Sequence, residues 1–306
     1  MKLLLCLNTK KGYSILDSII SQKKNEIIGS VISYTQRFEE VDYGFKIQEL
    51  CEKNNIDYLD WHETKQNLDD IIETREISGI IAIGWQYLIP MSLNNFLPDK
   101  IVIFHDSLLP KYRGFSPLAN AIIRGDSKTG LTVLYAAEKV DAGDILLQKE
   151  MKIDNSSYIS DLIDIMSEIY IEAFFEFLSL VEKSKLAPIP QDNDHATYGI
   201  WRNPEDNLID WNGSANTIRN LIRASGLPYS GAYSFLSGKL IRIWRCEVLN
   251  YDLFFEVRDS GKIWQIEDGF PIIICGQGLL KVTSASYNDG SDALPIRKVR
   301  QRFESK

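Results

Sequence analysis

Short apolar runs alternate with amphipathic stretches along the first half of the chain. The apolar runs predict strands over residues 2–7, 27–34, 57–61, 79–85, 101–104 and 131–137. Between them, apolar residues recur at helical spacing near 14–22, 45–53, 66–74 and 117–123. Strands that are apolar throughout and alternate with helices are typical of a parallel sheet with helices on both faces. This half therefore predicts an α/β fold built on a doubly wound, mostly parallel sheet.

The second half of the chain has a different pattern. A long helix is predicted over 157–183, and residues 184–196, with Pro188, Pro190 and no periodicity, predict a linker. One amphipathic helix at 215–224 is followed by short strands separated by glycines at 239–244, 263–266, 271–275 and 279–282. We therefore expect a catalytic domain over 1–183, a linker over 184–196 and a smaller, mostly-β domain over 197–306.

Composition and charge narrow the classes of function. The 306 residues are 44% hydrophobic and 25% charged, which is typical of a globular protein, and the net charge of -8 disfavours a broad nucleic-acid surface. Four scattered cysteines form no C-x-x-C pair, so no metal site is expected, and Cys6 and Cys275 lie in apolar runs that predict buried thiols. The apolar run 3–7 is too short for a signal core or a membrane span, which favours a cytoplasmic location without a membrane partner.

The candidate chemistry centres on two short motifs. His105 ends the apolar strand 101–104 and opens the run His-Asp-Ser-Leu-Leu-Pro-Lys-Tyr-Arg-Gly at 105–114, and Val-Asp-Ala-Gly-Asp at 140–144 follows the strand 131–137. Ligands of parallel sheets bind beyond the carboxyl ends of the strands, so Trp85, His105 and Asp141 are expected in one crevice. A carboxylate beside a histidine orients the ring and favours its charged form. Strand alternation turns Asp106 away from His105.

These motifs resemble the folate-dependent formyltransferase superfamily. Further matching segments are Tyr-Gly-Ile-Trp-Arg-Asn-Pro-Glu-Asp at 198–206, Ile-Asp-Trp at 209–211, Leu-Ile-Arg-Ala at 221–224 and Pro-Tyr-Ser-Gly-Ala at 228–232. The sequence at 198–206 is most similar to that of sugar-nucleotide N-formyltransferases. The resemblance implies a Rossmann-like core and formyl transfer from 10-formyltetrahydrofolate to the primary amine of an amino-deoxy sugar linked to dTDP or UDP. It implies no metal and allows a homodimer.

The resemblance also implies roles for the two motifs. Amine attack on the formyl carbon develops negative charge on the formyl oxygen, which protonated His105 would stabilise, while Asp141 accepts the amine proton or orients His105. Asp144 is the competing acid, but the family places its catalytic acid first in this motif. The family also has an asparagine two residues before the histidine, and that position is Ile103 here, on the same strand face as His105.

Because Ile103 cannot donate a side-chain hydrogen bond, three explanations stay open. A neighbouring donor, such as Gln86, Asn120 or a backbone N–H, replaces the asparagine. Alternatively the enzyme is slower, or it has lost catalysis and kept binding.

Two further sets of residues follow from the resemblance. Aromatic and apolar side chains suit the flat pterin, with core packing as the alternative: Trp85, Tyr87, Leu88, Ile89, Leu108, Leu109 and Pro110, with backbone groups of Ala137, Glu138 and Val140. Cations and aromatics suit the phosphates and base of the acceptor: Tyr112, Arg113, Gly114, Trp201, Arg202 and Tyr229. Trp211 and Tyr229 would equally suit the core of the small domain. His62 and His195 lack such context.

Three functions remain to be separated. The first is formylation of a sugar nucleotide. The second is methionyl-tRNA formyltransferase, against which the net charge and the scarcity of lysine and arginine over 112–123 count. The third is a folate- or sugar-nucleotide-binding protein without transfer, which Ile103 allows because a fold alone does not fix a function.

Overall fold

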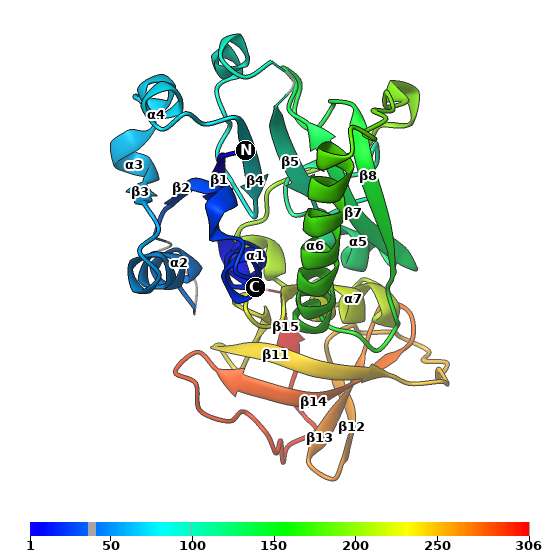
Figure 1. The fold of residues 1–306 in the computed structure, drawn as a ribbon. Coiled ribbons are helices and arrows are strands. Elements are labelled where there is room, and N and C mark those ends of the chain that lie inside the picture. The colour runs from blue at the N-terminus through cyan, green and yellow to red at the C-terminus, as the bar shows by residue number, and fades with distance from the viewer. Residues whose placement is uncertain (36–40, 99, 306) are drawn as a thin grey trace. The chain divides into compact units, whose positions relative to one another are not determined.

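A computed structural model of the chain describes residues 1–35, 41–98 and 100–305. The chain divides into two compact units, whose elements are labelled in Figure 1. The first unit comprises Met1–Pro117, Lys128–Lys152 and Asp161–Ile200. The second comprises Leu118–Ser127, Ile153–Ser160 and Trp201–Lys306. Two short segments, 118–127 and 153–160, thus belong to the second unit although segments of the first unit flank them in the chain.

The first unit is built on a sheet whose described part has seven strands in the order β3-β2-β1-β4-β5-β7-β8. The first five strands in that order pair in parallel, whereas β7 is antiparallel to β5 and β8 is antiparallel to β7. Their bounds are β1 (Leu3–Leu7), β2 (Ile28–Ser33), β3 (Tyr58–Asp60), β4 (Gly79–Ile83), β5 (Ile101–His105), β7 (Lys128–Tyr135) and β8 (Ile145–Lys152). The predicted mostly parallel sheet is confirmed, and the antiparallel pair at one edge was not expected.

Helices of the first unit cover both faces of this sheet. Phe104 on β5 packs against Tyr170, Phe174 and Phe177 of α6. Because side chains alternate along a strand, Ile103 and His105 face the other side, where Ile103 packs on an apolar cluster that includes Trp61 of α3. The helices of the first unit are α1 (Thr9–Ser21), α2 (Tyr43–Lys53), α3 (Trp61–Thr64), α4 (Leu68–Thr74) and α6 (Ile159–Glu182), with 3₁₀ turns η1 (Asn25–Ile27), η2 (Met91–Asn95) and η3 (Asn193–His195). From Leu118 onward, helix α5 (Pro117–Arg124) belongs to the second unit.

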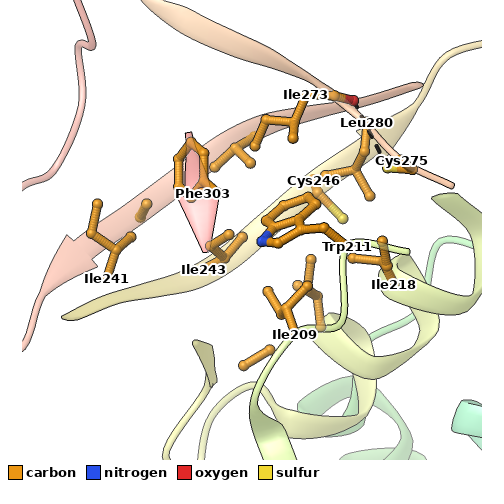
Figure 2. Packing of buried hydrophobic residues seen from close by; sticks show 14 of the residues in the cluster. Ile209, Trp211, Ile218, Ile241, Ile243, Cys246, Ile273, Cys275, Leu280 and Phe303 are labelled. Carbon is orange, nitrogen blue, oxygen red and sulfur yellow. Dashed lines mark hydrogen bonds between the residues drawn. The ribbon is translucent and has the colours of Figure 1, made fainter. Parts of the chain in front are cut away.

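The second unit contains an antiparallel sheet, six-stranded within the described residues, in the order β12-β13-β14-β11-β10-β15. Its elements are η4 (Pro204–Asn207), α7 (Ala215–Ser225), β10 (Ala232–Leu236), β11 (Lys239–Val248), β12 (Ile263–Glu267), β13 (Phe270–Ile274), β14 (Leu279–Tyr287) and β15 (Phe303–Glu304). Figure 2 shows Trp211 in the apolar core of this unit. Trp211 is 2% exposed and its indole N–H donates to Ser234 Oγ at 3.0 Å. Trp211 is therefore a core residue, and the predicted small mostly-β domain is confirmed.

A short parallel pair joins the motif at 105–114 to the segment near 198. It consists of β6 (Arg113–Gly114) and β9 (Tyr198–Gly199). All four cysteines are free and buried, as predicted for Cys6 and Cys275. No helix among the described residues is both long and apolar enough to cross a bilayer.

Candidate active site

His105 stands at the C-terminal end of β5, with 8% of its side chain exposed. Its Nε2 lies 2.8 Å from the carbonyl oxygen of Tyr112. A carbonyl oxygen only accepts hydrogen bonds, so Nε2 carries a proton and donates it. The other ring nitrogen, Nδ1, lies 3.5 Å from Oδ2 of Asp141. A second proton, on Nδ1, would make the ring a cation that can pair with this carboxylate.

Asp141 is held beside the histidine from its other side. Its carboxylate oxygen Oδ2 accepts a 2.7 Å hydrogen bond from the backbone N–H of Gly114, and its side chain is 10% exposed. Among the described residues, no other carboxylate lies within 4 Å of the His105 ring nitrogens. The structure thus brings Asp141, rather than Asp144, to His105.

The route by which Asp141 reaches His105 differs from the one predicted. Strand β7 runs antiparallel to β5, with His105 opposite Thr132 and Val102 opposite Tyr135. The chain consequently leaves β7 at the end of β5 remote from His105. Residues 136–144 fold back to bring Asp141 to the histidine. The two residues meet because of this loop, and not because parallel strands share a carboxyl edge.

Asp106 points away from His105, as predicted. Its Oδ1 accepts a 2.6 Å hydrogen bond from the hydroxyl of Tyr170 on α6, and its Oδ2 pairs with the ammonium of Lys11 on α1. Burial opposes ionisation, but the charge and hydrogen bond of Lys11 and the hydrogen bond of Tyr170 hold the pKa of Asp106 below its ordinary value. Burial, together with this carboxylate, raises the pKa of Tyr170. The network anchors the end of β5 on the face opposite His105.

Ile103 packs among apolar side chains beside the histidine. Trp85, Ile89 and Ala136 pack against the same apolar cluster as Ile103. Gln86 is exposed, and Asn120 belongs to the second unit. The indole N–H of Trp85 is buried and has no hydrogen-bond acceptor within the part of the chain that the structure describes.

The predicted pterin-pocket residues fall into two groups. Trp85 and Ile89 belong to the packed cluster and Leu109 is buried, whereas Tyr87, Leu88 and Val140 are exposed. Tyr87 stacks on Trp61 with 5.4 Å between ring centroids. The remaining members are partly buried or lie in loops: Leu108, Pro110, Ala137 and Glu138. Packing and exposure are thus both present along this set.

The Arg113 guanidinium is buried and hydrogen-bonded within the first unit. Arg113 is 2% exposed, and its guanidinium donates to Gln191 Oε1 at 2.8 and 3.1 Å and to Asn193 Oδ1 at 2.8 Å. Nε and Nη2 of this guanidinium are therefore used within the first unit, and the substrate-binding role of Arg113 stays a prediction. Tyr112 contacts His105 through its backbone carbonyl, and Gly114 contacts Asp141 through its backbone N–H.

The other predicted acceptor residues lie in the second unit. Trp201 and Tyr229 are exposed, and the indole N–H of Trp201 donates to Asn203. Arg202 donates to the carbonyl of Asp206 at 2.9 Å, and burial lowers the pKa of its guanidinium. The acceptor-binding roles of these three residues stay predictions.

The segment predicted as a linker contributes to the first unit. Ile189 and Ile145 exchange two backbone hydrogen bonds, Thr197 N–H donates to the Pro110 carbonyl, and Thr197 Oγ1 accepts from Tyr112 N–H. The Gln191 side chain lies between Arg113 and the loop of Asp141. Sequence reasoning missed these residues because prolines and polar side chains hid a segment that pairs through its backbone.

Comparisons with known proteins cover both halves of the chain. A family model described as "Formyl transferase" matches residues 8–177, and one described as "Formyl transferase, C-terminal domain" matches 202–299. A methionyl-tRNA formyltransferase of Caldanaerobacter subterraneus subsp. tengcongensis is 29% identical over 292 residues, which are 94% of this chain and 89% of that protein.

Two solved structures share the fold. The N-formyltransferase of Helicobacter canadensis, in complex with folinic acid and dTDP-3-aminofucose, has a TM-score of 0.72 at 17% identity, covering 92% of this chain and 99% of that one. WlaRD, a sugar 3N-formyl transferase with dTDP and 5-N-formyl-THF, has a TM-score of 0.70 at 18% identity, covering 94% and 98%.

Proposed function

Because this chain belongs to the formyl transferase family, we propose that it formylates the primary amine of a nucleotide-linked amino-deoxy sugar. Formyl transfer itself, as an N-formyltransferase, follows from the family. The observation that carries the proposed mechanism is the His105–Asp141 pair, with 3.5 Å between Nδ1 and Oδ2. The donor is 10-formyltetrahydrofolate, which supplies a formyl group on nitrogen.

His105 stabilises the formyl oxygen during transfer. Nε2 is committed to the Tyr112 carbonyl, so Nδ1 is the nitrogen that faces the reacting groups. With Nδ1 protonated, the ring is a cationic hydrogen-bond donor at the position where negative charge develops. The neighbouring Asp141 carboxylate orients the ring and pairs with its charged form. No side-chain donor at position 103 assists it, so His105 carries more of this stabilisation.

Asp141 accepts a proton from the attacking amine and then releases it. As the amine nitrogen bonds to the formyl carbon, one N–H proton passes to the Asp141 carboxylate. The bond between the formyl carbon and the donor nitrogen then breaks, and that nitrogen takes the proton. The Gly114 N–H holds Oδ2 in place during both transfers.

The surroundings of Trp85 fit the flat ring of a folate. Trp85, Ile89 and Ile103 pack against one apolar cluster, and the buried indole N–H of Trp85 is available to an acceptor atom on a bound heterocycle. Tyr87 adds an exposed aromatic ring next to Trp61.

Two observations favour a sugar nucleotide as the acceptor. Both structural neighbours named above were solved with dTDP or a dTDP-linked amino sugar, and the net charge of -8 opposes binding to a large polyanion. The second candidate acceptor is methionyl-tRNA, favoured by the relative that is 29% identical over 94% of this chain.

The two acceptors are separated by one experiment. Purified protein is incubated with 10-formyltetrahydrofolate and either dTDP- and UDP-linked 3-amino and 4-amino sugars or methionyl-tRNA, and acceptor mass is measured. We expect one added formyl group on a sugar. Formylation of methionyl-tRNA alone would overturn the sugar assignment.

The catalytic roles are tested with matched variants. His105→Gln and Asp141→Asn should each lower kcat about 100-fold or more without loss of the folded state. Asp144→Asn is the control, because it changes a neighbouring acid that does not contact His105. Near-normal kcat in Asp141→Asn would remove Asp141 from the mechanism.

A further inference from the structure

Gln191 occupies an unusual place between the two motifs. Its side chain is buried, 9% exposed, and its Nε2 donates to the carbonyl oxygens of Asp141 at 2.8 Å and Gly143 at 2.7 Å. Its Oε1 accepts two hydrogen bonds from the Arg113 guanidinium. We propose that Gln191, oriented by Arg113, is a positioning residue that holds the Asp141 carboxylate beside His105. The proposal rests on the catalytic role proposed for Asp141.

The orientation of the Gln191 amide follows from its neighbours. A guanidinium can only donate and a backbone carbonyl can only accept, so the amide oxygen faces Arg113 and the amide nitrogen faces Asp141 and Gly143. Both amide hydrogens and both oxygen lone pairs are then used. Any residue without two donors and an acceptor at these positions leaves at least one buried group unsatisfied.

The loop held by Gln191 has a backbone that needs support. Asp141 has φ of 51°, in the left-handed region that residues with a Cβ disfavour. At Gly143 a Cβ would lie 1.9 Å from the Tyr135 carbonyl oxygen, so the chain passes too close to β7 for a larger residue. The two hydrogen bonds from Gln191 fix the carbonyls of Asp141 and Gly143 and so restrain the backbone that carries the Asp141 side chain.

Arg113 couples this support to the other motif. Its guanidinium is buried and its contacts to Gln191 and Asn193 are with neutral oxygens, while the next residue, Gly114, donates its N–H to the Asp141 carboxylate. Asp141 is thus hydrogen-bonded at two points, at its carbonyl by Gln191 and at its carboxylate by Gly114. Arg113 is connected to both points, because its side chain donates to Gln191 and its backbone continues into Gly114.

Attachment of the segment itself does not depend on the Gln191 side chain. The backbone bonds between Ile189 and Ile145 and between Thr197 and Pro110 hold the chain on either side of Gln191. We therefore expect variants at Gln191 to fold, with the effect concentrated on the loop of Asp141.

The kinetic test combines single and double variants. Gln191→Met keeps the side-chain volume without the hydrogen bonds, and Gln191→Glu keeps the acceptor for Arg113 while removing both donors. Each should lower kcat about 10- to 100-fold with KM values within about threefold, because a small misplacement of a catalytic group reduces rate more than binding. Asn193→Ala removes one Arg113 contact without touching the loop and should change kcat less than about threefold.

The double variant decides whether Gln191 acts through Asp141. In an Asp141→Asn background, Gln191→Met should lower kcat less than about twofold further, because the group that it positions is already inactive. If the two effects multiply instead, Gln191 acts independently of Asp141 and the proposal is wrong.

A second readout needs no acceptor and so stands even if the proposed acceptor is incorrect. The chain has three histidines, so ¹⁵N-histidine NMR resolves the His105 ring with His62 and His195 as internal references. Gln191→Met should move the ¹⁵N chemical shifts of the His105 ring in the same direction as Asp141→Asn, because both variants change the carboxylate contact at Nδ1. A shift in Asp141→Asn with none in Gln191→Met would overturn the proposal.

Discussion

Removal of the Asp106 charge by Asp106→Asn should destabilise the first unit more than an ordinary ion pair would suggest. The ammonium of Lys11 and the carboxylate of Asp106 are 12% and 14% exposed, and Tyr170 donates to the other carboxylate oxygen. Breaking one partner of a buried pair leaves an uncompensated charge, which costs about 3–5 kcal/mol. Because some exposure remains, we expect about 3 kcal/mol at pH 7 for Asp106→Asn. The double variant with Lys11→Met should cost no more than either single change.

The assay is urea unfolding followed by far-UV circular dichroism, at pH 7 and at steps down to pH 3. The folded-state pKa of Asp106 is lowered, so its contribution is present above the unfolded value of about 3.9 and is lost as the pH falls through the lower folded value. The stability difference between wild type and Asp106→Asn should therefore shrink below about pH 4.

A matched control is an ion pair between α1 and α6, the helices that carry Lys11 and Tyr170. Lys10 and Asp164 join α1 to α6 with 2.5 Å between the charged atoms, but their side chains are 38% and 63% exposed. After screening by solvent, Asp164→Asn should cost no more than about 0.5 kcal/mol. Equal losses for the two aspartates, or a loss below about 1 kcal/mol for Asp106→Asn, would refute the reasoning from burial.

Three further predictions concern other parts of the chain. Gly114→Ala places a Cβ 2.8 Å from the Gly199 carbonyl and should reduce kcat at least tenfold, whereas Gly238→Ala, also at positive φ but with open space around it, should not; steady-state kinetics compares them. Trp211→Ala should cost about 3–5 kcal/mol in urea unfolding, because it empties the core of the second unit and removes the partner of Ser234. Burial raises each thiol pKa to about 12, so Ellman's reagent should detect thiols only after denaturation: Cys6, Cys51, Cys246 and Cys275.

Hydrophobic periodicity predicted elements whose apolar side chains face the core. The strand at 101–104 and the helix at 157–183 correspond to β5 and α6, because buried strands and long amphipathic helices have patterns set by the core. Strand β8 was missed. It is an edge strand whose residues 148–152 alternate between lysine, glutamate, glutamine and one buried methionine, and such a pattern resembles a solvated loop.

The motifs indicated which residues meet, but not how they are supported. His105 and Asp141 were predicted as a pair and lie together. The resemblance implied that Arg113 contacts the acceptor, because cations suit phosphates, and the structure shows it buried against Gln191. Gln191 gave no periodic signal, since its partners are an arginine 78 residues earlier and a backbone carbonyl 50 residues earlier. Contacts of this range are set by the tertiary fold and leave no local pattern.

The hydrogen bond from Gln191 to the Asp141 carbonyl also has a consequence for biosynthesis. The two residues are 50 positions apart, and a ribosome adding about 5–20 residues per second needs about 3–10 s to make that stretch. During this interval the nascent chain already contains His105 and Asp141 but lacks the Gln191 amide that holds the loop of Asp141. A fragment ending at residue 183, after the last predicted helix of the first domain, would remain in that unfinished condition permanently.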